Sequence, residues 1–375
     1  MLSRVASVGG TIAGSLTEWF PLPEMLFPRA AGIDISDTSV KWIVLEGKPG
    51  DAQVEVCGHA ELPSGAVVNG VVEDAHALVD ALHDVRNELG GIRYVHAGLP
   101  EEAAYVFGMH VPSSSSRKQI LSMIEFELEG RVPIAPGAAV YDFDRVETRA
   151  DGSSEEISVV VFPRDLAESY AHAFKDAGLA LLSLELESRS AARAVSSGRP
   201  DEPITMLVDF GRLRTGLAVL KRGIPIFTST VQVGGEMIDR AISEKLSLSP
   251  EDATTFKNEE GLLAKGGKSS RGLEAISGTA AALADEIMRH YHYWDTRRSG
   301  EGDRTTPVEQ VFLIGGSANL KGLGDYIAGR VQAEVVRPNV WQHVNNFDGY
   351  VPPIDRRTSL EYATAVGLAL RNFSL

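Results

Sequence analysis

The sequence predicts an α/β protein with two domains, and two observations carry this prediction. The first is a unit made of an apolar strand ending in an aspartate, a polar turn and a second apolar strand, which occurs at 30–47 and again at 206–223. The second is the alternation of strand and helix patterns, which is typical of sheets covered by helices. At 375 residues the chain is long enough for two domains of about 150 residues each.

The composition excludes several classes of protein. The formal net charge is −15, and an acidic surface repels phosphate backbones, so no nucleic acid partner is expected. Cys57 is the single cysteine, which excludes an internal disulfide and a cysteine-rich zinc site and favours a reducing, cytoplasmic setting. The sequence has no apolar run of about 18 residues, so no transmembrane helix is expected.

Residues 1–29 are predicted to form an N-terminal amphipathic segment. Apolar residues recur there at steps of three to four, at Val5, Val8, Ile12 and Leu16. A glycine pair and a weak apolar core argue against a signal peptide. Two readings stay open: a terminal segment that packs on its own protein or stays unstructured, and a peripheral membrane or partner contact through residues 2–20.

The first domain is predicted at 30–198. It opens with strand patterns and one helix pattern that stops at a glycine pair, at 31–36, 40–46, 54–62, 73–90 (helix) and 93–99. Residues 101–180 or so follow the order β-α-β-β-α, which predicts a small α+β subdomain inserted in this domain. The Ser/Gly/Pro-rich stretch 196–203 is the predicted linker to the second domain.

The second domain is predicted at 199–359 and begins with the repeated hairpin. A glycine pair then opens a helix in "GGEMIDRAISEKL", and a long helix is expected near 273–297. The segment "FLIGGSANLKGL" predicts a buried strand, a glycine turn and a helix. The small residues of the predicted C-terminal helix, 360–372, suit close packing when this helix returns to the first domain.

The two hairpins contain residue types that bind phosphate and Mg²⁺. Hydroxyls, backbone N–H groups and one lysine can hold phosphate oxygens, and the first hairpin offers Ser36, Thr38, Ser39 and Lys41. The second hairpin has Gly211, Arg212 and Thr215 in its turn. Asp34 and Asp209 end the two apolar strands and can organise a hydrated Mg²⁺ ion. Each unit alone is usually an ordinary hairpin, but two facing copies would clamp a triphosphate.

Glycine turns strengthen this interpretation. Gly315 and Gly316 stand between a buried strand and a helix, where a flat ring or a phosphate can approach the backbone. The same turn carries two polar candidates, Ser317 and Asn319. The second glycine turn supplies three more, Gly234, Gly235 and Glu236. Two hairpins and two glycine turns in this order favour a nucleotide site.

The order of these elements resembles the actin-like ATPase superfamily, in which two related domains close over a nucleotide. The predicted subdomain inserted in the first domain resembles the one found in the FtsA and PilM families. The segments "RKQILSMIEFELEGRVPIAPGAAVYDF", "GGEMIDRAISEKLSLSPEDA" and "EYATAVGLALR" resemble the PilM family more closely. The resemblance covers about residues 30–375.

The resemblance to PilM implies an adaptor in type IV pilus assembly. It implies ATP and Mg²⁺ bound in an interdomain cleft on the cytoplasmic face of the inner membrane. It also implies a grip, partly through the inserted subdomain, on the N-terminal cytoplasmic tail of PilN in the inner-membrane alignment complex. Whether the chain forms a homo-oligomer stays open.

Several residues depart from the family pattern. Ser36 replaces a common glycine, and Asp37 brings a negative charge near the expected phosphates. Whether Arg212 and Arg214 offset this charge at the phosphates or face solvent is left open. Relatives commonly carry Ala-Glu-x-x-Lys near the ribose, whereas this chain keeps Lys257 and has Thr254 in the glutamate position.

One catalytic candidate and three alternative functions remain. Glu187 could position a water for hydrolysis or serve as a buried or capping residue, so the expected activity is at most a slow ATPase or nucleotide binding without turnover. An FtsA-like membrane-tethered filament is one alternative. A small-molecule kinase of the same superfamily would need a base, and no convincing one is found. The third alternative is the cytoplasmic part of a secretion protein related to PilM, although proteins of that kind usually continue into a membrane span.

Overall fold

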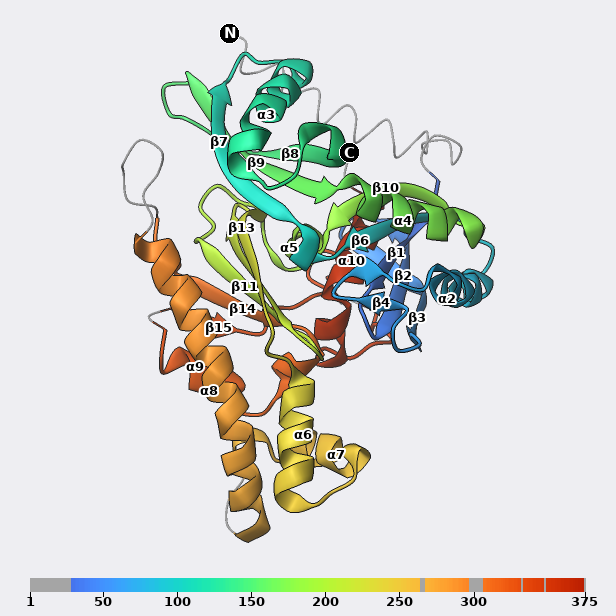
Figure 1. Ribbon diagram of the computed structural model, residues 1–375, viewed down its shortest axis with the longest axis vertical. Helices are drawn as coiled ribbons and strands as arrows, with labels where there is room; N and C mark the ends of the chain where they lie inside the picture. The colour runs from blue at the N-terminus through green and yellow to red at the C-terminus, as the bar shows by residue number, and fades with distance from the viewer. Residues whose placement is uncertain (1–27, 264–266, 297–305, 332, 347–348, 374–375) are drawn as a thin grey trace.

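The computed structural model describes residues 28–263, 267–296, 306–331, 333–346 and 349–373 (Figure 1). The predicted N-terminal amphipathic segment therefore lies almost entirely outside the described residues.

The first of two five-stranded sheets is built from the N-terminal hairpin. Its strands are β1 (Ala30–Ile35), β2 (Ser39–Lys48), β3 (Asp51–Glu61), β6 (Tyr94–Leu99) and β10 (Ala180–Leu186), in the spatial order β10-β6-β1-β2-β3. The β1–β2 and β2–β3 pairs are antiparallel, whereas β1–β6 and β6–β10 are parallel.

The second sheet repeats this topology. Its strands are β11 (Thr205–Phe210), β12 (Thr215–Lys221), β13 (Ile224–Val231), β14 (Gln310–Ile314) and β15 (Glu334–Val336), in the order β13-β12-β11-β14-β15. The hairpin strands are again antiparallel, and the two later strands are parallel to β11. Asp34 and Asp209 are each the second-last residue of the first strand. The α/β class and the repeat predicted from the two hairpins are confirmed.

Two helices lie between the sheets, α5 (Glu187–Val195) and α10 (Ala363–Leu370), and the largest apolar core joins both of them to strands of each sheet (Figure 1). Helix α10 packs so closely on β1 and on α5 that glycine is required at the contact points. A Cβ on Gly32 would lie 2.2 Å from the carbonyl oxygen of Ala365, and one on Gly367 would lie 1.7 Å from that of Ser190. The C-terminal helix α10 thus packs closely on β1 of the first sheet and on α5.

The opposite face of the first sheet is covered by α2 (Ala75–Glu88) and α4 (Arg164–Asp176), which share a second apolar core with it. A short hairpin, β4 (Val67–Val68) and β5 (Val71–Val72), lies beside them. The residues of this core include Leu78, Leu82, Tyr170 and Phe174. Helix α4, which falls within the predicted insertion, therefore packs with the first sheet.

A third core belongs to what we call the three-stranded unit: β7 (Tyr105–Pro112), α3 (Arg117–Arg131), β8 (Ala139–Thr148) and β9 (Ser154–Pro163). Its sheet has the order β7-β9-β8, with α3 packed on one face. Ser116 and Gln119 form a capping box that starts α3. The β-α-β-β part of the predicted order is observed here.

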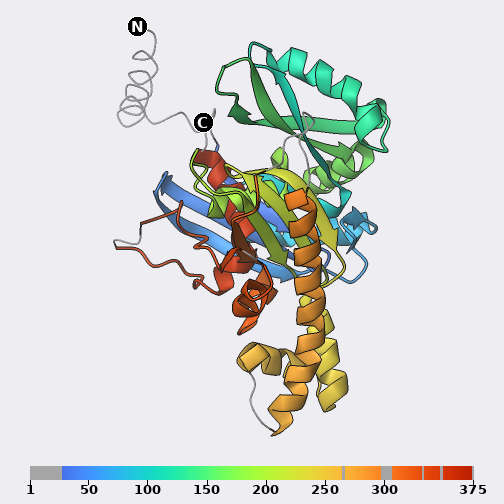
Figure 2. The same cartoon turned by 90° about the vertical axis from the view of Figure 1, so that its left-hand side faces the viewer.

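The second sheet carries its own helices, α6 (Gly235–Leu246), α7 (Pro250–Glu259), α8 (Gly267–Thr296) and α9 (Leu323–Ala328). Figure 2 shows α8 running past the sheet, with α6 and α7 beside its far end. Short 3₁₀ turns complete the chain at Glu101–Ala103, Pro136–Ala138, Gly261–Leu263, Gly316–Asn319, Thr358–Tyr362 and Arg371–Phe373. None of the described helices is long and apolar enough to cross a bilayer.

Candidate functional site

A cavity of about 960 Å³ lies where the turns of the two sheets face each other. Most of the predicted site residues line it: Asp34, Ser36, Thr38, Ser39, Lys41, Glu187, Asp209, Gly211, Arg212, Gly235, Glu236, Lys257, Gly315, Gly316 and Ser317. Segments far apart in the sequence therefore converge on one cavity, because the two sheets repeat the same topology and present the same ends to it.

The turn after β1 is organised by Ser36. Its hydroxyl accepts hydrogen bonds from the backbone N–H groups of Thr38 (3.4 Å) and Ser39 (3.1 Å). Lys41 on β2 donates to the hydroxyl of Ser39 at 3.0 Å, which keeps its ammonium group over the turn. The serine side chain thus holds the turn in shape.

Asp37 does not point freely into the cavity. Its carboxylate accepts the backbone N–H groups of Asn69 (2.8 Å) and Gly70 (3.0 Å) and forms an ion pair with Arg214. Arg214 also pairs with Glu102, and its side chain is 14% exposed. The structure therefore gives Arg214 a third role that the sequence does not suggest: it neutralises Asp37 across the cavity.

Arg212, the other arginine of that turn, is 59% exposed and lies 3.5 to 3.6 Å from Glu236 and Glu61. It lines the outer part of the cavity beside the start of α6.

Four carboxyl groups meet at the base of the cavity: Glu101, which is buried, and Asp34, Glu187 and Asp209, which are partly buried. Burial raises the pKa of Glu101 to about 7 and that of Asp209 to about 7, with a further contribution to Asp209 from the Asp34 charge. Burial, followed by the charges of the other three, raises the pKa of Glu187 well above its usual value. Burial also raises the pKa of Asp34, which the nearby Lys41 partly opposes. Such a set of desolvated acids favours a cation.

The sequence does not single out Glu101. It stands two residues after the end of β6, and its carboxylate accepts hydrogen bonds from the Ser188 backbone N–H at 3.0 Å and the Ser188 hydroxyl at 2.8 Å. These groups belong to the first turn of α5, where a carboxylate is favoured by the helix dipole. One signal in the sequence could have pointed to Glu101: the acidic pair Glu101–Glu102 follows a buried strand. Ligand sites form at the carboxyl ends of parallel strands of this kind.

Two glycines allow the turns on the second sheet's side of the cavity to pack closely together. Gly315 has φ +86°, and a Cβ there would lie 2.4 Å from Oδ1 of Asp209. Gly235 starts α6, and a Cβ there would lie 2.1 Å from the hydroxyl oxygen of Ser317, which donates to the Gly211 carbonyl at 3.1 Å. The glycine turns therefore pack against the aspartate hairpin, a contact that the sequence does not indicate.

Lys257 is held by a carboxylate that the sequence does not indicate. Its ammonium group donates to Oδ2 of Asp239 on α6 at 2.6 Å, while Oδ1 of Asp239 is buried without a hydrogen-bond partner. Asp239, Thr254 and Lys257 all line the cavity. An acidic side chain thus stands beside Lys257 although residue 254 is a threonine.

Three predicted residues lie outside the cavity lining. Thr215 is buried, and its hydroxyl donates to the Val233 carbonyl at 2.6 Å, because it is the first residue of a fully paired strand. Gly234 packs on the backbone of the Arg212 turn, and Asn319 donates to the Arg357 carbonyl at 2.8 Å. These residues shape the turns around the cavity.

The residues present fit a hydrated metal and a phosphate group. Within the described ranges, no three His, Cys, Asp or Glu side chains are arranged to hold a metal ion by themselves. Asp34 and Asp209 are carboxylates with raised pKa values and few compensating cations, and oxygen donors of this kind suit a Mg²⁺ ion that keeps its waters.

Comparison with known proteins agrees with this fold. The chain is 24% identical to the cell division protein FtsA of Streptococcus pneumoniae serotype 2 (strain D39 / NCTC 7466), over 78% of this chain and 71% of that protein. A structure of a PilM-PilN type IV pilus biogenesis complex matches with a TM-score of 0.75 at 22% identity, covering 93% of this chain and 100% of that chain. MreB5 of Spiroplasma citri bound to AMPPNP matches with a TM-score of 0.52 at 12% identity, covering 90% and 94%.

These structural likenesses confirm the predicted actin-like two-domain fold. A family model described as "Type IV pilus assembly protein PilM" matches residues 32–373, which is nearly the whole chain. The chain therefore belongs to the PilM family of type IV pilus assembly proteins.

Proposed function

We propose that this chain is a nucleotide-binding adaptor of type IV pilus assembly: it binds Mg-ATP in the cavity between its two sheets and holds the N-terminal cytoplasmic tail of a PilN-like protein at the inner membrane. The observation that carries the nucleotide part is the convergence of both aspartate hairpins and the Gly315 turn on one cavity.

The turn after β1, the Gly211 turn and the glycine turn at 315–317 would hold the phosphates and the base. Asp34 and Asp209 would hold Mg²⁺ through its waters. Bound Mg²⁺ would supply the positive charge that offsets both the phosphates and the buried carboxylates. The likeness to an AMPPNP-bound MreB5 supports a nucleotide in a fold of this kind.

The surroundings of Glu187 favour slow turnover or none. Burial and three neighbouring acids raise the pKa of Glu187, which disfavours the ionised form that a general base needs. We therefore propose that the product of this protein is an assembled complex rather than a reaction product.

The partner part of the proposal draws on the structure of the PilM-PilN complex. The match covers 93% of this protein and 100% of the matching chain of that complex. A PilN-like tail would bind partly through the three-stranded unit, which has a core of its own and protrudes from the first sheet (Figure 2). Binding to a membrane-embedded partner would place the protein on the cytoplasmic face of the inner membrane, as a peripheral component of the alignment complex.

The partner proposal is tested with a synthetic peptide of the N-terminal cytoplasmic residues of the PilN-like protein from the same organism. Fluorescence anisotropy should give saturable binding to the wild-type protein, and a scrambled peptide of the same composition should not bind. Equal binding of both peptides, or of neither, contradicts the proposed partner and leaves the nucleotide proposal standing.

A further inference from the structure

The three-stranded unit is joined to the second sheet by a cluster of charged contacts that do not line the cavity. The contact point on the second sheet is the turn between β12 and β13, made of Arg222 (φ +53°) and Gly223 (φ +71°). Positive φ at both central residues is the geometry of a two-residue type I′ turn, whose twist matches that of the flanking strands. The turn therefore continues the β12–β13 hairpin directly, with Lys221 paired with Ile224.

Charged side chains fasten this turn to β8 and β9. Lys221 lies between two carboxylates, 2.6 Å from Glu147 and 2.7 Å from Glu156, and Arg222 pairs with Glu147 as well. The hydroxyl of Ser158 on β9 donates to the Pro225 carbonyl. Each of these charged side chains is no more than about a third exposed, so the pairs are screened less than surface pairs.

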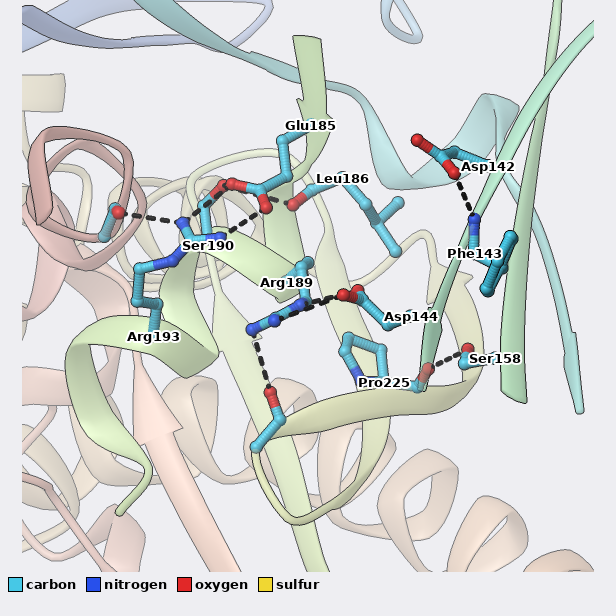
Figure 3. Close-up of polar contacts among 12 residues, drawn as sticks. Asp142, Phe143, Asp144, Ser158, Glu185, Leu186, Arg189, Ser190, Arg193 and Pro225 are labelled. Carbon is cyan, nitrogen blue, oxygen red and sulfur yellow. Dashed lines mark hydrogen bonds and ion pairs between the residues drawn. The ribbon is translucent and has the colours of Figure 1, made fainter. Parts of the chain in front are cut away.

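Arg189 adds a third partner to the contact. From α5 it donates to the Asp144 carboxylate on β8 at 2.8 Å and to the Gly223 carbonyl at 3.3 Å (Figure 3). One guanidinium group thus ties helix α5, the three-stranded unit and the second sheet's turn together. We call the set Asp144, Glu147, Glu156, Ser158, Arg189, Lys221, Arg222, Gly223 and Pro225 the clamp.

Both elements that enter the clamp begin at the cavity. Strand β12 starts next to the Gly211–Arg214 turn of the cavity and ends at Lys221, a span of about 20 Å for seven residues. Helix α5 starts with Glu187 and Ser188, which line the cavity, and Arg189 follows them directly. A displacement of either element at the cavity therefore reaches the clamp through a hydrogen-bonded strand or helix rather than through a flexible loop.

We propose that the clamp couples the cavity to the three-stranded unit, so that nucleotide binding changes the packing of this unit and its affinity for a peptide ligand. The inference rests on the proposed nucleotide site. Coupling between two binding sites is reciprocal, so the peptide bound by the unit changes nucleotide affinity by the same factor. The element on which this coupling would act is the contact between the β12–β13 turn and the strands β8 and β9, where Lys221 and Arg222 meet Glu147 and Glu156.

Hydrogen exchange of the full-length protein, with and without Mg-AMPPNP, tests the coupling. In the wild type the nucleotide should slow exchange at the cavity turns and also alter exchange along 139–163, which does not line the cavity. Two variants open the clamp from its two sides, Lys221→Gln with Arg222→Gln, and Glu147→Gln with Glu156→Gln. In each variant the change at the cavity turns should persist and the change along 139–163 should be lost.

The matched control is Arg117→Gln, which removes an ion pair with Asp142 inside the three-stranded unit at 2.8 Å. This variant should keep both exchange changes. A wild type that responds at the cavity turns only, or clamp variants that respond like the wild type, overturn the coupling and leave the nucleotide site intact. A wild type with no response at the cavity turns overturns the proposed nucleotide site and the coupling with it.

Discussion

Arg214, in the turn after β11, forms an ion pair with Asp37, in the turn after β1, although 177 residues separate them in the sequence. Both side chains are largely buried, at 14% and 11% exposed, and Arg214 also pairs with Glu102. The two hairpin turns of the cavity are thus held together by charge. Asp37, which by its sequence position threatens phosphate binding, is neutralised by this contact.

Replacing Arg214 by alanine should destabilise the fold by about 3 kcal/mol. The reason is that Asp37 and Glu102 would stay buried without their cation, and removing one member of a buried pair is costly. Urea unfolding measures the change. Arg212→Ala in the same turn is the matched control: its side chain is 59% exposed, and the expected change is within about 0.5 kcal/mol. Equal losses in both variants would contradict the assignment of the bridge to Arg214.

Replacing Gly315 by alanine should destabilise the protein, whereas replacing Gly316 should not. An alanine at position 315 would have to adopt φ +86°, and its Cβ would lie 2.6 Å from the Phe210 carbonyl oxygen. Together the strained backbone and the close contact should cost about 2 to 4 kcal/mol. At Gly316 the nearest atom would be 3.4 Å away, at the end of the Glu361 side chain. Thermal unfolding of the two variants side by side decides the point. A Gly315→Ala protein as stable as Gly316→Ala would show that the turn is not packed against β11 as described.

The buried Glu101 should make the free protein more stable as the pH falls. Its folded pKa of about 7 lies above the ordinary value of 4.5, so the folded state takes up a proton before the unfolded state does. Between about pH 8 and about pH 6 this one group should add about 1 kcal/mol to the free energy of unfolding. Below pH 4.5, the ordinary pKa that Glu101 has in the unfolded state, both states are protonated and the contribution of Glu101 to the free energy of unfolding stops changing.

The measurement compares urea unfolding of the wild type and Glu101→Gln at both pH values. Titration of groups that do not interact with Glu101, such as His96, whose pKa burial lowers to about 4, affects both proteins and cancels in the difference. Asp209 and Glu187 interact with Glu101, so the difference reports the titration of Glu101 together with its effect on these two acids. The wild type should gain more stability on acidification than the variant. An identical pH dependence in the two proteins would mean that Glu101 is not buried as an acid at the base of the cavity.

Much of the fold could be predicted because its signals are local. The repeated unit at 30–47 and 206–223, the glycine turns and the apolar periodicity each act over a few residues, and they predict most of the long strands and helices. The short hairpin β4–β5, helix α7 and strand β15 were not predicted. The two aspartates were predictable for the same reason, since each ends an apolar strand.

Residues whose roles depend on a distant partner could not be predicted in this way. Asp37 meets Arg214, Lys257 meets Asp239, and Glu101 meets Ser188 only after the sheets and helices have assembled. Thr215 shows the opposite case: its position matches a phosphate ligand by spacing, but the pleat of β12 turns its hydroxyl into the protein. Periodicity predicts elements, whereas the direction of a polar side chain at an element's end depends on tertiary packing.

The central claim is that the cavity binds Mg-ATP, and thermal unfolding with and without Mg-ATP tests it most directly. At a nucleotide concentration of about 100 times the dissociation constant, the wild type should gain about 2.7 kcal/mol of stability. Asp209→Asn should still fold, because it removes a buried acid with a raised pKa, and it should lose most of the shift. No shift in the wild type at millimolar Mg-ATP, or an equal shift in Asp209→Asn, would contradict the nucleotide site described here.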